Sequence, residues 1–231
     1  MKKAGHDLGN QFKKQRRLLL VSLLSLLGFL FVALYKNSFT TLDVSVSSWA
    51  LSIQTSVFTP LAEIIDVTFD TITLLIITVS IAAVLFYRKY WKHSVLLMGA
   101  MSGDALIVAL IKLSIQSVRP LEELLYDRGF SFPSGHTAGS VVFFGVLTYF
   151  AWSYWASSKV KILSGGLAVL VTALVGFDRI YLNVHWFSDV VGGYLVGVFW
   201  LTFSILMFHW LGQTVARAVC SLSISNKVSE A

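Results

Sequence analysis

The sequence predicts an all-α integral-membrane protein, built as a bundle of six transmembrane helices. Composition is the first reason: the 231 residues are 56% hydrophobic and 13% charged, whereas soluble domains are about 45–50% apolar and about 25% charged. A compact chain of this size still exposes roughly a quarter to a third of its unfolded surface. Lipid is the solvent that fits such a surface, and the same composition excludes a disordered chain.

Apolar runs are the second reason, because a helix needs about 20 mostly apolar residues to cross a bilayer. Six candidate runs cover residues 18–35, 71–87, 94–113, 137–155, 162–177 and 187–211. The first follows a basic flank, as a signal peptide does, but no small-residue cleavage site follows it, so we expect an uncleaved anchor. No repeat or linker interrupts the chain, which predicts a single domain over residues 1–231.

The basic residues predict the orientation of the bundle. If six spans alternate, most of the 18 Lys and Arg residues lie on the side of the two termini, and the positive-inside rule makes that side cytoplasmic. The tails 1–17 and 212–231 are then cytoplasmic, and the protein is expected in the cell membrane. The net charge of +6 is thus a topology signal and predicts no nucleic-acid partner. The cations left near the outer face are Lys36, Lys112, Arg119, Arg128 and Arg179.

The segment 36–70 is predicted to be extracytoplasmic. Trp49, Ala50, Ile53 and Val57 follow helical spacing with serines opposite, as in a helix that lies on the outer leaflet with a Trp anchor. A loop packed on the bundle explains the pattern equally well. Whether residues 42–66 form a lid stays open.

Lys112 and Arg119-Pro120 stand at the outer end of the third run. Seven residues are nearly two helical turns, so both cations can point the same way. Arg119 fits a snorkelling residue equally well, but Lys112 lies a turn inside the apolar run, where a charge is a functional candidate.

Pro133-Ser134-Gly135-His136 opens the fourth run. Unpaired N–H groups and the positive end of the dipole make such a helix start an anion site. A turn capped by Ser134 explains everything except the histidine, a group that exchanges protons near neutral pH.

Asp178, Arg179, His185 and Asp189 lie between the fifth and sixth runs. On a helix, His185 and Asp189 share a face one turn apart, so the carboxylate can hold one ring N–H and leave the other nitrogen free. A helix-start histidine beside a solvated aspartate is the plainer alternative.

Together the three clusters predict a phosphate site at the outer face. Three cations and a helix start suit a dianion, and two histidines with different neighbours can divide attack from proton donation. No carboxylate cluster provides a magnesium cage, and the single cysteine, Cys220, provides no thiolate site. We therefore expect no metal and no cofactor.

These residues resemble the signatures of the type 2 phosphatidic acid phosphatase (PAP2) superfamily of integral-membrane lipid phosphatases, K-x6-R-P, P-S-G-H and S-R-x5-H-x3-D. The chain has them in order, as Lys112-x6-Arg119-Pro120, Pro133 to His136, and Arg179-x5-His185-x3-Asp189. It departs at Asp178, where the family has serine. A carboxylate there repels phosphate unless a cation pairs with it.

The resemblance implies a role for each matching residue. His185 looks like the nucleophile that forms a phosphohistidine, Asp189 like its orienting partner, and His136 like the acid that protonates the leaving oxygen. The implied phosphate cradle consists of Lys112, Arg119, Ser134, Gly135 and Arg179.

The expected activity is removal of a terminal phosphate from a lipid phosphate or diphosphate, at headgroup depth on the periplasmic or exterior side. Phosphatidylglycerophosphate, undecaprenyl diphosphate, phosphatidate and lipid A phosphates all fit, and the oligomeric state is not readable. A lipid phosphotransferase that uses the same site is the nearest rival. An anion transporter is the rival from another class, and six spans argue against a vanadium haloperoxidase.

Two features fall outside the signatures. Asp104 lies eight residues before Lys112, deeper in the same run; a role at the site and a packing role with a polar neighbour are equally open. Gly193-x3-Gly197 is typical of close helix packing.

Overall fold

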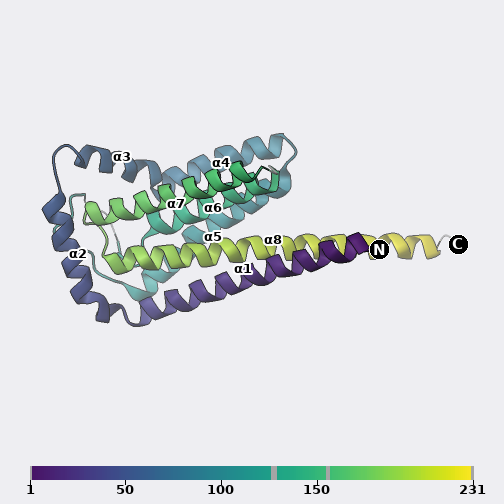
Figure 1. Ribbon diagram of the computed structural model, residues 1–231, viewed down its shortest axis with the longest axis horizontal. Helices are drawn as coiled ribbons and strands as arrows, with labels where there is room; N and C mark the ends of the chain where they lie inside the picture. The colour runs from purple at the N-terminus through teal and green to yellow at the C-terminus, as the bar shows by residue number, and fades with distance from the viewer. Residues whose placement is uncertain (1, 126–128, 155–156, 230–231) are drawn as a thin grey trace.

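The computed structural model describes residues 2–125, 129–154 and 157–229, and within these ranges its regular elements are all helices (Figure 1). Arg128 lies outside them. The elements are α1 (Lys2–Leu34), the 3-10 helix η1 (Lys36–Phe39), α2 (Thr40–Ile53), α3 (Thr59–Phe69), α4 (Thr71–Tyr87), α5 (Trp91–Ile115), α6 (Gly135–Tyr154), α7 (Ser158–Tyr181) and α8 (Phe187–Ser229). The all-α prediction is confirmed.

Four helices of the described ranges are long and apolar enough to cross a membrane: α1 from Phe12, α5, α7, and α8 as far as Thr214. The pair α3 and α4, bent by 50°, forms a fifth candidate. Helix α6 occupies the fourth predicted run but is not among these candidates. It packs against α4, α5, α7 and α8, so it faces protein rather than lipid and can carry small and polar residues.

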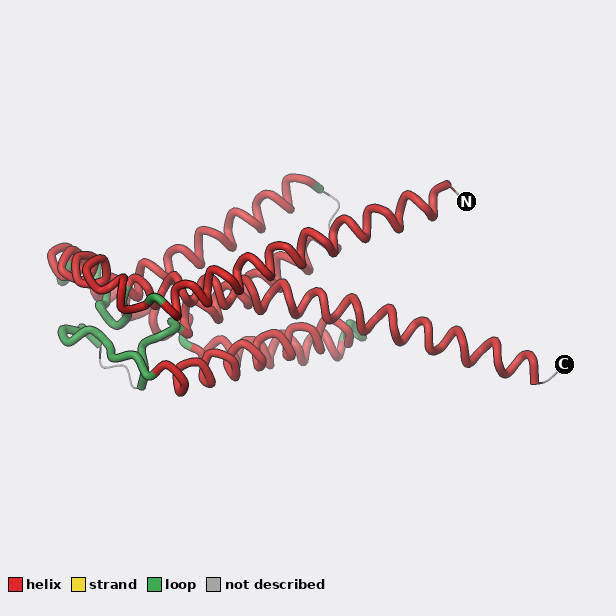
Figure 2. The backbone as a smooth tube through the Cα atoms, turned by 90° about the horizontal axis from the view of Figure 1, so that it is seen from below, coloured by secondary structure: helices red, strands yellow, loops and turns green. Residues whose placement is uncertain are grey.

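Helices α1 and α8 lie side by side in antiparallel directions, and both chain ends lie at the same end of the bundle (Figures 1 and 2). The predicted tails 1–17 and 212–231 continue these two helices along most of their length. Helix α2 runs across the opposite end (Figure 1). The segment 36–70 is therefore two helices and a 3-10 turn that cover this end.

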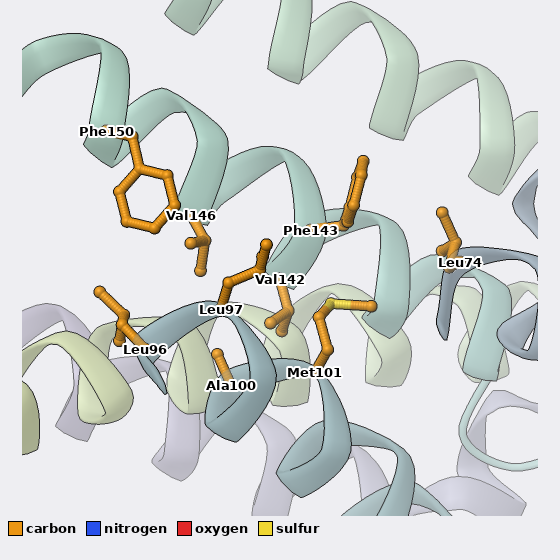
Figure 3. Packing of buried hydrophobic residues seen from close by; sticks show 9 residues of the cluster. All are labelled: Leu74, Leu96, Leu97, Ala100, Met101, Val142, Phe143, Val146 and Phe150. Atoms are coloured by element: carbon orange, nitrogen blue, oxygen red, sulfur yellow. The ribbon is translucent and has the colours of Figure 1, made fainter. Parts of the chain in front are cut away.

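The hydrophobic core between α4, α5 and α6 is formed by the side chains drawn in Figure 3, among which Leu97, Val142 and Val146 are fully buried. The outer surface is also apolar: Leu24 of α1 and Ile162 of α7 are 67% and 75% exposed. In water such a surface would be an aggregation hazard, whereas in a bilayer it faces hydrocarbon.

The two predicted packing glycines bring α8 against α6. A Cβ on Gly193 would lie 2.7 Å from the carbonyl oxygen of Ser134, and one on Gly197 would lie 3.0 Å from that of Ala138. Only glycine allows this approach of backbone to backbone. The contact places the start of α6 beside the start of α8, where the Ser134 N–H donates to the carbonyl of Asp189 over 3.0 Å.

Candidate active site

All three signature clusters meet at the end of the bundle that α2 covers. A cavity of about 230 Å³ there has walls from the end of α5, the starts of α4 and α6, and the loop between α7 and α8. Its charged and polar lining is Asp70, Thr71, Asp104, Lys112, Arg119, Gly135, His136 and His185. Residues up to 115 positions apart in the chain thus face one space.

Lys112 and Arg119 hold the loop that joins α5 to α6. The Nζ of Lys112 donates to the carbonyl of Phe130 over 2.5 Å, and the Nε of Arg119 donates to that of Gly129 over 3.1 Å. The Nη1 of Arg119 also donates to the carbonyl of Val184 over 2.6 Å. Both cations line the cavity, so an anion inside it meets two positive groups.

His185 lies in the loop before α8, with its two ring nitrogens in different surroundings. Nδ1 is 3.5 Å from Oδ2 of Asp189, and Nε2 is 3.4 Å from Nη1 of Arg119. The first separation exceeds a normal hydrogen bond, as is frequent for catalytic pairs before substrate binds. Burial lowers the pKa of His185 to about 3, helped by Lys112 and Arg119 and opposed by Asp189. A neutral imidazole keeps the lone pair that a nucleophile needs.

His136 stands in the first turn of α6 and meets a carboxylate that sequence reasoning missed. Its Nε2 lies 3.3 Å from Oδ1 of Asp66, on α3, and 3.8 Å from Oδ1 of Asp70. Asp70 caps α4 by accepting the N–H of Ile72 over 2.9 Å. Asp66 belongs to none of the three signatures, so their spacing does not identify it.

Arg179 is 1% exposed and is held by two carboxylates. Its Nη1 pairs with Asp66 and its Nη2 with Asp178, and its Nε also donates to Asp178, over 3.2 Å. Asp178, the departure from the family serine, is therefore neutralised by its neighbour. Arg179 is not among the residues that line the cavity, but its Nη1 lies 3.3 Å from Nε2 of His136, which does line it.

Ser134 and Gly135 take different positions at the start of α6. Gly135 lines the cavity, whereas Ser134 is fully buried and its Oγ accepts the hydroxyl of Thr137 over 3.0 Å. The Ser134 Oγ also accepts the N–H of Thr137 over 3.4 Å. In this structure Ser134 therefore acts as the cap of α6.

The segment 36–70 inserts two further charges behind the site. Lys36 donates to Oδ1 of Asp189 over 2.5 Å and to the hydroxyl of Ser188 over 3.0 Å. Asp43 accepts the N–H and the hydroxyl of Ser188 over 2.8 and 2.7 Å. Asp43 stands seven residues before Ala50, and both are buried; this helical spacing was the available sign that Asp43 points inward.

The cavity combines two cations, the open start of a helix, a neutral histidine with a carboxylate behind it, and a second histidine. Such a set can bind a phosphate group, attack its phosphorus and supply a proton to the leaving oxygen. With the membrane-spanning bundle around it, this arrangement defines an integral-membrane phosphatase.

Comparison with known proteins gives the family. The model of the PAP2 superfamily matches residues 94–213, and the chain belongs to this superfamily. It is 31% identical over 181 residues to phosphatidylglycerophosphatase B of Bacillus subtilis (strain 168), covering 77% of this chain and 89% of that protein. It is 30% identical over 91 residues to the putative undecaprenyl-diphosphatase YbjG of Escherichia coli (strain K12), covering 39% and 41%.

A solved structure has the same fold. The chain is similar to the transmembrane PAP2-type phosphatidylglycerolphosphate phosphatase from Bacillus subtilis, with a TM-score of 0.71 and 28% identity over 79% of this chain and 93% of that one. The helical membrane fold of this superfamily thus extends over most of the chain.

Proposed function

We propose that this enzyme is a metal-independent lipid phosphate or diphosphate phosphatase that acts through a phosphohistidine. The observation that carries this proposal is the position of His185, whose Nε2 lies beside Arg119 while Nδ1 faces the buried Asp189. Phosphatidylglycerophosphate, undecaprenyl diphosphate and phosphatidate are the candidate substrates. The names of the relatives support the first two.

The reaction has two steps. In the first, Nε2 of His185 attacks phosphorus, the bond from phosphorus to the leaving oxygen breaks, and His136 gives that oxygen a proton. In the second, water attacks the phosphohistidine while His136 takes a proton from it, which releases phosphate and restores His185. Lys112, Arg119 and the backbone N–H of Gly135 stabilise the charge on the phosphoryl oxygens throughout.

The proposed placement has six spans, both termini in the cytoplasm and the cavity on the outer side of the cell membrane. It is supported by the basic residues near the chain ends and by the position of both ends at the end of the bundle opposite α2 (Figure 1). A lipid can then present its phosphate to the cavity while its tails stay in the bilayer.

The proposal is tested by measuring phosphate release from each of the three lipids by the purified, detergent-solubilised protein. Release should persist in EDTA, because the proposed reaction needs no metal. His185→Ala should lower kcat by at least about a thousandfold, whereas the control His209→Gln, on the distal part of α8, should leave it unchanged. Acid-labile label on the protein from radiolabelled substrate should disappear in His185→Ala. Normal turnover by His185→Ala contradicts the mechanism. Label found in a second lipid indicates a phosphotransferase. If the wild-type protein releases no phosphate at all, a transporter is favoured.

A further inference from the structure

Asp104 is a buried carboxyl group that the mechanism above does not use. It lies on α5 and is 4% exposed, and its Oδ1 is buried without a hydrogen-bond partner among the described residues. Such an atom is unfavourable, because it has lost its hydrogen bonds to water without gaining others. The same residue lines the cavity that contains Lys112, His136 and His185. The Oδ1 atom itself has almost no accessible surface, so a group bound in the cavity meets Asp104 through the small part of the residue that stays accessible.

The cavity extends along α5 from Lys112 to Asp104. The two residues are eight positions apart, so their backbones are separated by about 12 Å along the helix axis. Between them the wall consists of the short side chains Ala105, Val108 and Ala109. On the facing helix, Gly139 has no side chain, and a Cβ there would lie 3.7 Å from Oδ2 of Asp104. Along α5 the wall of the cavity is thus polar at Lys112 and at Asp104 and apolar between them.

This order of polar and apolar residues along α5 distinguishes two kinds of lipid. In phosphatidylglycerophosphate a glycerol and a phosphodiester separate the terminal phosphate from the ester-linked glycerol, so hydrogen-bonding groups continue well below the phosphate. In a polyprenyl diphosphate, hydrocarbon follows the phosphates directly. A carboxyl group accepts a hydrogen bond from a hydroxyl or, in its neutral form, donates one to an ester carbonyl, but it gains nothing from hydrocarbon.

We propose that Asp104 is a specificity-determining residue that hydrogen-bonds the glycerol or ester region of a glycerolipid whose phosphate lies at Lys112, and so favours that class over polyprenyl diphosphates. The proposal rests on the proposed phosphatase function and names its substrate class. Asp104 touches the part of the substrate that leaves, not the phosphorus, so its removal should change discrimination rather than chemistry.

The test compares kcat/KM for dioleoyl phosphatidylglycerophosphate and farnesyl diphosphate in mixed micelles, with farnesyl diphosphate also measured as a competitive inhibitor. Asp104→Leu should lower the value for the glycerolipid by about 10- to 100-fold and leave turnover or inhibition by farnesyl diphosphate within a few-fold. Asp104→Asn, which keeps a donor and an acceptor, should retain most of the glycerolipid activity. Ser102→Leu, on the exposed face of the same helix, is the matched control.

Three results would contradict the proposal. An equal loss on both lipids in Asp104→Leu, or no loss on either, overturns the assignment of Asp104. Loss in Asp104→Asn as large as in Asp104→Leu contradicts a hydrogen-bonding role. If the wild-type protein releases phosphate from neither lipid and neither competes, the proposed function itself fails, and the inference with it.

Discussion

Oδ1 of Asp66 lies 3.3 Å from Nε2 of His136 and also pairs with Nη1 of Arg179. One carboxylate oxygen on α3 therefore joins the proposed acid to a member of the implied phosphate cradle. This oxygen of Asp66 thus lies between a guanidinium group and an imidazole. It compensates the charge of Arg179 and fixes the ring of His136 before substrate binds.

Replacement of Asp66 should therefore damage catalysis. We expect Asp66→Asn to lower kcat by about 10- to 100-fold, part of the contribution of a positioned acid, because His136 loses the partner that orients it. Glu63→Gln, an exposed site on the same helix, removes the same charge and should have no effect on phosphate release. A rise in activity in Asp66→Asn would instead mean that this carboxylate blocks the site.

Lys36 should act through Asp189. Lys36→Met leaves the buried carboxylate without its cation, and breaking a buried pair costs roughly 3–5 kcal/mol. We expect a lower melting temperature and at least about a tenfold lower kcat, since Asp189 then holds His185 less firmly. Lys36→Arg should restore most of the activity. Lys159→Met, at an exposed site at the start of α7, is the control. An equal loss of melting temperature and kcat in this variant would contradict a role of Lys36 through Asp189.

The low pKa of His185 predicts a pH dependence of stability. Its pKa is about 3 in the folded protein, against 6.5 for an unperturbed histidine. Between these values the unfolded chain binds a proton at His185 that the folded chain does not bind, so stability falls as the pH is lowered through this window. Thermal unfolding in detergent from pH 7 to pH 4 should show a shallower loss in His185→Gln than in wild type. Parallel curves would show that His185 protonates in the folded protein.

The contact between α6 and α8 should tolerate no side chain at Gly193. Gly193→Ala places a Cβ 2.7 Å from a backbone carbonyl and should destabilise by about 1–3 kcal/mol, with a loss of activity because His136 moves away from His185. Gly212→Ala, on the same helix with nothing within 4 Å, should be neutral or stabilising by up to about 1 kcal/mol. Equal melting temperatures for the two variants would contradict the packing account.

Asp70 and Ser134 show which roles of a helix-start residue can be predicted from the sequence and which cannot. Asp70 caps α4, and its place directly before the apolar run 71–87 is a sign of such a cap that the sequence contains. Ser134 fits both a cap and a phosphate ligand by its position, and its burial and its bond to Thr137 are properties of the packed bundle. Helix α6 is enclosed by other helices and does not need the apolar surface by which a membrane span is recognised. That α6 crosses the membrane therefore stays a prediction.

The sequence by itself determined the helical membrane fold and the set of chemical groups at the site, because composition, run length and motif spacing are local properties of the chain. Only the tertiary structure decided which other charges join that set. Lys36, Asp43 and Asp66 come from a segment whose contacts depend on how α2 and α3 fold over the end of the bundle. Partners that meet through packing have no fixed spacing along the chain, so their pairing is a property of the fold.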